Sequence, residues 1–236
     1  MLRRSVSFAA LLFLVLAAAS APAGLAITKE FNQTYPLQPG GSFELQNVNG
    51  TVDVQGWDRD TIEIHAVKTA KRKESDLDLV SIDIDAKPGV VSVATRYPQN
   101  EGVEVAVEYT VHVPHCAHVE HLGTVNGNIE VFEGGGSVHA RTTNGNVHLE
   151  LLHVQDKDGA IAETTNGSVL LAVPADTQAD LETKCLNGNF SSELPVAFES
   201  TLKPREMHGK LGRGGAPIRL HTVNGGIRLV ALRSTV

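Results

Sequence analysis

Six copies of the dipeptide Asn-Gly recur in similar phrases such as ARTTNGNVHL and AETTNGSVLL, and this repetition constrains the fold more than any other feature. The repeated asparagines are Asn49, Asn126, Asn144, Asn166, Asn187 and Asn224. The three central gaps measure 18, 22 and 21 residues. The gap of 37 residues before Asn224 fits two units with one Asn-Gly lost near His208-Gly209. We expect the first gap, of 77 residues, to hold three or four degenerate units.

Apolar or small residues alternate with polar residues on both sides of each asparagine. In one unit the inward set is Val138, Ala140 and Thr142 before Asn144, followed by Val147 and Leu149 after it. Side chains two residues apart lie on one face of a strand. A strand period combined with a fixed repeat predicts an all-β fold, a β-solenoid of units about 18–22 residues long with Asn-Gly corners.

The polar columns of the repeat predict contacts between stacked units. Stacked asparagine amides can hydrogen-bond from unit to unit, and threonine hydroxyls two residues earlier can do the same. We expect the asparagine at each corner to take a left-handed conformation and the glycine to take a positive φ. The predicted ladder residues are Asn126, Asn144, Asn166, Asn187, Asn224, Thr124, Thr142, Thr164 and Thr222. A series of separate type I′ hairpins is the alternative interpretation.

The expected stacking order places opposite charges side by side. Three residues before their asparagines stand Arg141, Glu163 and Lys184, which alternate in sign. If units stack in chain order, these side chains are neighbours at a strand spacing of about 4.8 Å. The same order places Asn166 between the units of Asn144 and Asn187, with Asn224 in the last unit.

Residues 27–114 are also expected to form strands, although less regularly. Segments such as TIEIHA and VEVAVEYTVHV alternate, and turn residues separate them. Residues 71–80 are charged and fit either a loop or one short helix. We expect an N-terminal β-section at 27–114 and the Asn-Gly solenoid at 115–236, with no linker that proves two independent domains.

The N-terminus has the pattern of a signal peptide over residues 1–26. Two arginines precede an apolar run from Phe8 to Ala19, and Gly24-Leu25-Ala26 fits the cleavage pattern. An uncleaved anchor is the alternative, and no later segment fits a membrane-spanning helix. Removal of 1–26 leaves 18 basic and 27 acidic residues, a net charge of −9, which argues against nucleic acid as a partner. We therefore expect export to the periplasm, the cell surface or the medium.

Three features together resemble the bacterial putative-adhesin family of β-strand-repeat proteins. They are the Gly56 to Asp60 segment GWDRD, the Val113-Pro114 pair after an alternating strand, and the repeated T-x-N-G-x-[VI]-x-[LV] phrase. The resemblance extends from about Phe43 to Leu232. It implies a right-handed solenoid-like fold in an exported bacterial protein, and some similar proteins are implicated in envelope-stress sensing. It supplies no catalytic residues for this chain.

Histidines and cysteines offer the main alternatives to a purely structural repeat. Histidines recur every three residues around Cys116, but a three-residue step alternates strand faces, so we expect no metal site and no cofactor. The weak candidates for metal ligands are His115, His118, His121 and His139. His121 and His139 should be stacked neighbours. Whether Cys116 pairs with Cys185 stays open, because a disulfide requires close Cα atoms.

We expect a non-catalytic envelope module for adhesion, binding or scaffolding, with an unidentified glycan or protein ligand. A sensor of envelope damage is the second interpretation. A polysaccharide-active β-helix enzyme is the rival class, and it requires paired or clustered carboxylates on one exposed face. A face of mixed charge would instead favour the binding module.

Overall fold

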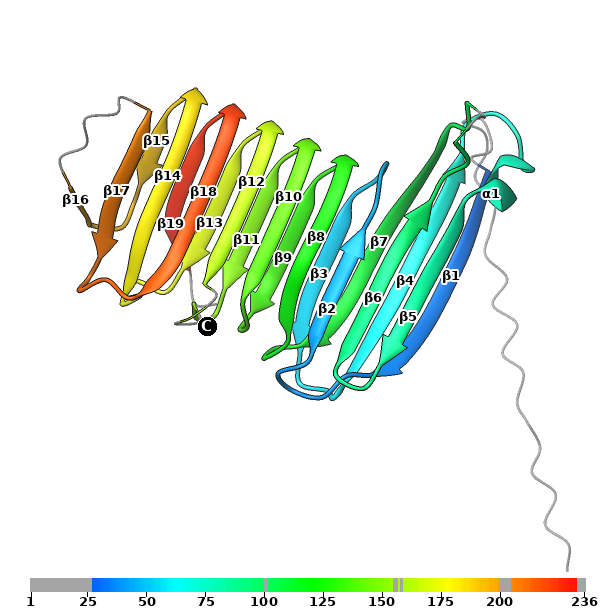
Figure 1. The fold of residues 1–236 in the computed structure, drawn as a ribbon, viewed down its shortest axis with the longest axis horizontal. Coiled ribbons are helices and arrows are strands. Elements are labelled where there is room, and N and C mark those ends of the chain that lie inside the picture. Colours follow the sequence, from blue (N-terminus) through cyan, green and yellow to red (C-terminus); the bar gives the residue numbers. More distant parts are fainter. Residues whose placement is uncertain (1–26, 100–101, 155–156, 158, 200–204, 233–236) are drawn as a thin grey trace, which may run out of the picture.

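The computed structural model describes residues 27–99, 102–154, 157, 159–199 and 205–232. Two large sheets face each other and do not close into a barrel (Figure 1). The nine-stranded sheet has the order β1 (Ile27–Pro36), β4 (Thr61–Ala70), β7 (Val105–Pro114), β3 (Val52–Trp57), β9 (Ile129–Gly134), β11 (Val147–Leu151), β13 (Val169–Val173), β19 (Ile227–Ala231), β15 (Phe190–Ser192). The ten-stranded sheet has the order β16 (Val196–Phe198), β17 (Glu206–Leu211), β14 (Ala179–Asn187), β18 (Ala216–Asn224), β12 (Ala160–Asn166), β10 (Val138–Asn144), β8 (His118–Asn126), β2 (Ser42–Gln46), β6 (Val90–Arg96), β5 (Ser81–Lys87).

Each Asn-Gly unit forms one coil with a strand in each sheet. In the unit of Asn144, β10 ends at the asparagine, the chain turns at Gly145, and β11 follows in the opposite sheet. Neighbouring coils are parallel and in register, so that Asn144 pairs with Asn126 on one side and Asn166 on the other. The predicted all-β solenoid with Asn-Gly corners is confirmed, and separate hairpins are excluded because the paired strands are parallel.

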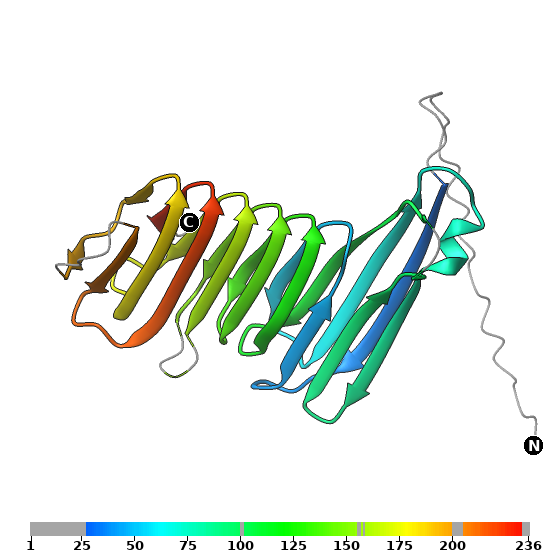
Figure 2. The ribbon, with the colours of Figure 1, turned by 45° about the horizontal axis from the view of Figure 1, so that its top comes forward.

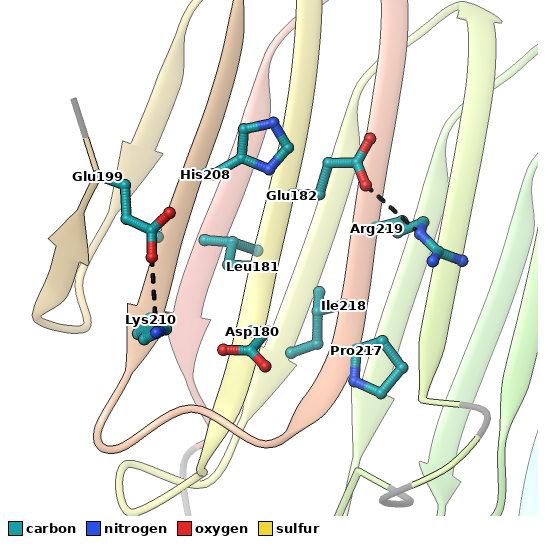
Figure 3. Close-up of a pocket in the computed structure, with 10 residues that line it drawn as sticks. Asp180, Leu181, Glu182, Glu199, His208, Lys210, Pro217, Ile218 and Arg219 are labelled. Atoms are coloured by element: carbon teal, nitrogen blue, oxygen red, sulfur yellow. Dashed lines mark ion pairs between the residues drawn. The ribbon is translucent and has the colours of Figure 1, made fainter. Parts of the chain in front are cut away.

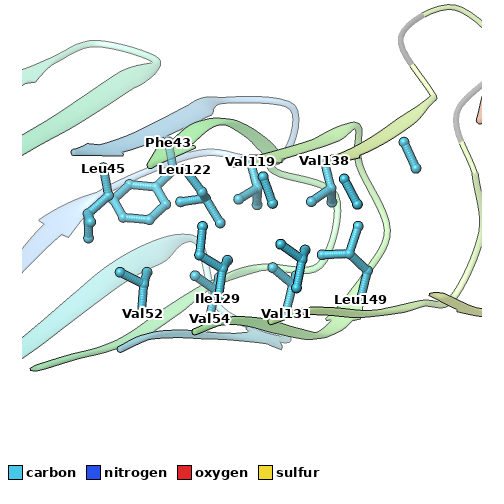
Figure 4. Packing of buried hydrophobic residues seen from close by; sticks show 14 of the residues in the cluster. Phe43, Leu45, Val52, Val54, Val119, Leu122, Ile129, Val131, Val138 and Leu149 are labelled. Atoms are coloured by element: carbon cyan, nitrogen blue, oxygen red, sulfur yellow. The ribbon is translucent and has the colours of Figure 1, made fainter. Parts of the chain in front are cut away.

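The inward columns of the repeat form one continuous core between the sheets. Phe43, Leu45 and Leu122 from the ten-stranded sheet face Val52 and Ile129 from the nine-stranded sheet (Figure 4). All five side chains are buried. Small inward residues of the central coils, such as Ala140 and Ala162, are buried in the same core.

The coils do not stack in chain order, which corrects the expected order. The last coil, β18 and β19, lies between the coils of Asn166 and Asn187 (Figures 1 and 2). After β15 the chain forms β16 and β17, and β17 runs antiparallel to β14 before the chain returns to the gap. The 37-residue gap therefore holds an edge hairpin and no lost coil, and His208-Gly209 lies in β17.

The first gap also differs from expectation, because Asn49 lies directly beside Asn126. The intervening residues form one parallel coil, β6 and β7, without an Asn-Gly corner. They also form the antiparallel strands β4 and β5. Between these two strands stands the short helix α1 (Asp76–Leu79), whose Leu77 is buried. The sheets of the N-terminal section and of the repeat are continuous.

Candidate functional site

The corner asparagines form an unbroken chain of side-chain hydrogen bonds along one edge of the stack. The amide nitrogen of Asn166 donates to the amide oxygen of Asn144 at 2.7 Å, and Asn224 donates to Asn166 at 2.8 Å. Asn187 donates to Asn224 at 2.8 Å, so Asn224 is an interior member. The spatial order is Asn49, Asn126, Asn144, Asn166, Asn224, Asn187.

The threonines bond to glycine carbonyls and not to one another. Thr164 donates its hydroxyl to the carbonyl of Gly145 at 2.8 Å, and Thr222 donates to Gly167 at 2.8 Å. Thr142 and Thr124 make the equivalent bonds to Gly127 and Gly50 at 2.9 and 3.2 Å. Cys185 takes the same place, with its sulfur 3.2 Å from the carbonyl of Gly225. Each of these bonds joins two neighbouring coils, so the threonines bond from unit to unit, with a glycine carbonyl as the acceptor.

The corner glycines are required by close packing more than by their conformation. A Cβ on Gly145 would lie 2.0 Å from the carbonyl oxygen of Gly127, and one on Gly167 would lie 1.9 Å from that of Gly145. The corner asparagines are not left-handed, because His121 and Glu133 are the only non-glycine residues with positive φ in the described part. The corner thus depends on glycine stacking, and the expected left-handed asparagine is wrong.

A second row of hydrogen bonds, which the sequence analysis did not predict, joins neighbouring coils just after the corner. The side-chain oxygen of Asn128 accepts from the backbone N–H of Asn146 at 2.9 Å, and that of Asn146 accepts from Ser168 at 2.8 Å. The signal was present as a column of Asn128, Asn146, Ser168 and Asn189, two residues after four of the six corner asparagines.

The outer face of the ten-stranded sheet carries three adjacent shallow hollows, which form the candidate binding site. The largest, about 410 Å³, spans β2, β8, β10 and β12. It shares Arg141 and Glu163 with a hollow of about 240 Å³ over β10, β12, β18 and β14. The third, about 290 Å³, continues along β14 and β18 to β17 (Figure 3). The hollows follow one another across the strands, in the direction of the solenoid axis.

The charges that line these hollows are balanced and largely paired. The basic lining residues are Arg141, Lys184, Lys210 and Arg219, and the acidic ones are Asp180, Glu182, Glu199 and Glu163. Figure 3 shows two of the ion pairs, Glu182–Arg219 at 3.4 Å and Glu199–Lys210 at 3.5 Å. The face therefore offers alternating donors and acceptors without a strong net charge.

A line of ionisable side chains crosses the middle of this face. His221 lies between two carboxylates, 3.4 Å from Glu163 and 3.6 Å from Glu182. Arg141 approaches Glu163 at 3.7 Å, and Arg219, which is on the same strand as His221, approaches Glu182 at 3.4 Å. His221, and not Lys184, is the strand neighbour of Glu163, which corrects the predicted charge sequence.

A bulge in β8 shapes the largest hollow. β8 carries one extra residue relative to both β2 and β10, and His121 has a φ of 52° at this point. The bulge turns His121 outward, where its ring meets that of His139 edge-to-face at 6.4 Å. Gly123 leaves the space beside them open to the Gln46 side chain, which a Cβ on Gly123 would meet at 2.3 Å.

The four histidines named above as candidate metal ligands do not lie together in the structure. His115 lies 3.5 Å from Asp58 and donates from Nδ1 to the carbonyl of Glu133 at 3.0 Å, whereas His118 lies 2.8 Å from the Ser137 hydroxyl. His121 and His139 are the adjacent pair on the outer face. Among the described residues, no group of three or more His, Cys, Asp or Glu side chains is arranged to hold a metal ion. Cys116 and Cys185 are both free thiols.

The opposite face, on the nine-stranded sheet, carries a small group of acids. Asp53 is the strand neighbour of Glu130. Burial raises the pKa of the Asp53 carboxyl, and the negative charges of Glu130 and Glu108 raise it further. None of the three lines the three hollows of the ten-stranded sheet.

Comparisons with known proteins agree with this architecture. A putative cell adhesion protein from Clostridium sporogenes is similar over 86% of this chain and 100% of its own, with 10% identity and a TM-score of 0.60. A putative adhesin from Bacteroides fragilis covers 86% of this chain and 97% of its own, with 10% identity and a TM-score of 0.30. A putative lipid binding protein from Parabacteroides distasonis covers 86% and 97%, with 8% identity and a TM-score of 0.25. Of these three structures, only the Clostridium sporogenes protein has a TM-score high enough to support a shared fold.

The family comparison covers the repeat region of the chain. A comparison with curated proteins finds no match. Residues 115–230 match the family model described as Toastrack DUF4097, whose fold is solenoid-like. Residues 115–230 of this chain are therefore similar to the Toastrack DUF4097 family, in agreement with the resemblance to the bacterial putative-adhesin family that the repeated phrases indicate.

Proposed function

We propose that this protein is a non-catalytic binding module of the bacterial cell envelope that holds an extended polar ligand on the outer face of its ten-stranded sheet. The observation that carries the proposal is the row of three adjacent hollows on that face. From Gln46 on β2 to Glu199 beside β16 the row crosses eight strands, about 34 Å at a spacing of about 4.8 Å. A linear glycan or an extended peptide segment fits this shape.

The lining favours hydrogen bonding over stacking as the basis of recognition. No Trp, Tyr or Phe is among the residues that line these three hollows in the described part of the chain. Exposed guanidinium, imidazole and carboxylate groups alternate along the row, and each can bond a polar ligand at low net charge. Balanced charge also supports a partner other than nucleic acid, which requires a basic surface.

A binding experiment with matched variants tests the proposal. The probes are a panel of bacterial glycans and solubilised envelope fractions, and the face variant is the double change Arg141→Glu and Lys184→Glu. The control is Arg228→Glu on the opposite sheet, where Arg228 pairs with Glu193 at 3.1 Å. We expect the face variant to lose at least tenfold in affinity while the control binds like the parent. Equal binding by the parent and both variants would contradict the proposed face.

Export is part of the same proposal. The expected signal peptide, residues 1–26, lies outside the described residues. In the described part, no helix combines the length and hydropathy needed to cross a membrane. Mass spectrometry of protein isolated from its host should find a mature N-terminus near Ile27. An intact Met1 in a cytoplasmic fraction would contradict export.

The acidic group on the nine-stranded sheet gives the rival enzyme hypothesis a specific test. Glu130 and Glu108 lie close enough to Asp53 to raise the pKa of its carboxyl, and polysaccharide cleavage requires a group of carboxylates of this kind. The mixed charge of the hollowed face and the separation of these acids from it favour the binding module. Cleavage of a glycan by the parent protein, lost in Asp53→Asn, would overturn the non-catalytic assignment.

A further inference from the structure

The hollows on the outer face of the ten-stranded sheet differ in charge from one end of the row to the other. Among the described residues, three acids and two permanent cations line the hollow that ends at β17 (Figure 3). The 410 Å³ hollow over β2, β8, β10 and β12 is lined instead by one acid, Glu163, and one permanent cation, Arg141. It is also bordered by the imidazole rings of His121 and His139. The row therefore has an acidic end and an end rich in nitrogen donors.

The donor-rich end is built around a local distortion of β8. His121 has a φ of 52°, a left-handed conformation that is costly for a residue with a Cβ. Its backbone carbonyl accepts a hydrogen bond from the side-chain amide of Gln46, which occupies the space over Gly123. Bulges that re-aim a side chain are common beside binding sites. Here the bulge holds one ring beside His139, at the rim of the largest hollow.

The guanidinium of Arg141 remains available to a ligand. The Arg141 side chain is 80% exposed, and its contact with Glu163 is long, at 3.7 Å. Glu163 is shared with His221, which lies 3.4 Å from it on the far side. A guanidinium carries five N–H donors in a planar fork that matches a carboxylate. Arg141 can therefore bind an acidic group of a ligand without losing its neighbour.

The charged groups around the two rings leave one side of the hollow open to an anion. Glu120 precedes His121 on β8, and its strand neighbour on β2 is Glu44, which bonds the Ser92 hydroxyl at 3.1 Å. Neither acid lines the hollow. On the other side, the strand neighbour of His139 on β12 is the uncharged Ile161. An acidic group therefore meets least repulsion over β10, between the imidazoles and Arg141.

We propose that this hollow, which we call the histidine hollow (Gln46, His121, Gly123, His139 and Arg141), binds the carboxylate of an acidic sugar residue in a linear glycan. The inference rests on the proposed function, because it assigns a ligand chemistry to one part of the same face. Imidazole side chains gain a proton between about pH 8 and pH 5. Binding of the carboxylate is therefore stronger in mildly acidic solution, where both rings add to the charge of Arg141.

The position of the hollow favours a glycan over an acidic peptide. Extended peptides are usually held by backbone pairing at an edge strand. β8 and β10 lie inside the sheet and are paired on both sides, so their backbones offer no such edge. The hollow is also lined by Ile161 and by Val125, which is 41% exposed. These two side chains can contact the C–H face of a sugar ring.

The acidic end of the row indicates what the rest of the glycan should be. The carboxylates of Asp180 and Glu182 line the third hollow and accept hydrogen bonds from sugar hydroxyls, but they repel a second acidic sugar. A glycan that alternates acidic and neutral sugars therefore fits the row better than a uniformly acidic one. A suitable probe is a tetrasaccharide of alternating glucuronate and N-acetylglucosamine, and its methyl ester is the matched neutral probe.

Titration calorimetry of the protein with both probes tests the inference. At about pH 5.5 we expect the acid tetrasaccharide to bind at least fivefold more tightly than its ester. At about pH 7.5 its affinity should be at least threefold weaker, whereas the affinity of the ester should not change with pH. Equal affinity for acid and ester at both pH values would overturn the inference, as would binding of neither probe.

Matched variants show whether the two rings are responsible. His121→Asn with His139→Gln removes both imidazoles, and asparagine tolerates the left-handed backbone at position 121. We expect this variant to keep the circular dichroism spectrum of the parent and to retain less than a twofold preference for acid over ester. The control is His65→Gln on β4 of the opposite sheet, where His65 bonds Asn32, and it should bind like the parent. A double variant with the parent's acid preference and pH response would contradict the role of the rings.

Two further results separate this inference from the proposed function. Equal binding of acid and ester, with both lost in Arg141→Glu and Lys184→Glu, would overturn carboxylate recognition and leave the proposed binding face in place. Loss of neither probe in that face variant would contradict the face itself. Tighter binding of a glutamate peptide than of the acid tetrasaccharide would overturn the glycan assignment and make the partner an acidic peptide.

Discussion

The parallel stack of Asn-Gly coils and the N-terminal antiparallel strands belong to the same two sheets but are stabilised differently. In the stack each residue lies beside its equivalent in the next coil, so one useful contact is repeated at every level. Among β1, β4 and β7 most neighbours are unlike residues, such as Asn32 beside His65, and His65 beside Thr110. The core there depends on larger side chains, including Ile62, Ile64 and Tyr109.

At the boundary between the two regions, the coil of Asn49 packs against a coil that has no corner glycine. Beside Gly50 the next coil offers Val107 in place of a corner glycine, and the Asn47 amide donates to the Val107 carbonyl at 2.8 Å. A Cβ on Gly50 would still lie 2.1 Å from that carbonyl. The close approach between backbones therefore continues to the coil of β6 and β7, which lies beside the Asn49-Gly50 corner. This coil has no Asn-Gly sequence of its own.

Glycine substitution should give the largest difference between the two regions. Gly145→Ala forces its Cβ against the Gly127 carbonyl, and we expect a loss of at least about 3 kcal/mol in unfolding free energy, because backbone must move. Gly102→Ala, in the N-terminal section, meets open space and should change stability by less than about 0.5 kcal/mol. Chemical denaturation measures both, and a tolerated Gly145→Ala would refute close glycine stacking.

The threonine column gives the next largest effect. Thr164→Val removes the hydroxyl that bonds the Gly145 carbonyl, at an expected cost of about 1–2 kcal/mol. Thr183 is also fully buried, but its hydroxyl has no partner, so Thr183→Val should be neutral or stabilising. Thermal and urea unfolding of the pair compare the same chemical change with and without a hydrogen bond. Equal losses would mean that volume and shape, and not the bond to glycine, determine the effect.

Alanine at the corner asparagines should have a smaller effect that depends on position in the stack. These amides are exposed, so we expect about 0.5–1.5 kcal/mol for Asn166→Ala or Asn224→Ala, each of which breaks two bonds. Asn187→Ala breaks one bond at the end and should cost less. A loss for Asn224 that matched Asn187 and fell below Asn166 would place Asn224 at the end after all.

The smallest effect should come from Asp53 on the nine-stranded sheet. Its folded pKa is raised above its ordinary value of 3.8, so the charged form is penalised in the folded state. Asp53→Asn should therefore stabilise the protein at neutral pH by less than about 1 kcal/mol, since the group is only half-buried. The gain should shrink as pH falls and vanish below about 3.8, where the carboxyl is protonated in both states. A gain that grew toward acidic pH would contradict the direction of the shift.

The sequence was sufficient to predict the strand period, the corner and the columns that face the core. Those features depend on side-chain alternation and on Asn-Gly, and both are local. It was not sufficient to predict the order of the coils. The coils of Asn144, Asn166 and Asn224 present the same Asn, Thr and Gly edge, and the coil of Asn187 carries Cys185 in the threonine position. The unit of Asn224 therefore fits after Asn187 as well as beside Asn166. The deciding structure is the antiparallel hairpin of β16 and β17, which carries no repeat signal.

The hollowed face was only partly predictable for a related reason. The adjacency of His121 and His139 follows from the repeat and is observed. The bulge at His121, which enlarges the hollow, adds one residue to β8 and is invisible to an alignment made on the asparagines. The line through Glu163, His221 and Glu182 depends on the inserted last coil, so no reading in chain order would assemble it.

The insertion of the last coil between its two predecessors is tested most directly by disulfide trapping. Both variants carry Cys116→Ser, which removes one of the two free thiols. One variant adds Glu163→Cys with His221→Cys, and the other adds Glu163→Cys with Lys184→Cys. Glu163 and His221 are paired on adjacent strands, within the range that a disulfide spans, whereas β18 separates Glu163 from Lys184 by two strand spacings, about 9.6 Å. We predict rapid disulfide formation in the first variant and none in the folded second variant. A disulfide only between positions 163 and 184 would show that the coils stack in chain order and would contradict the inserted coil.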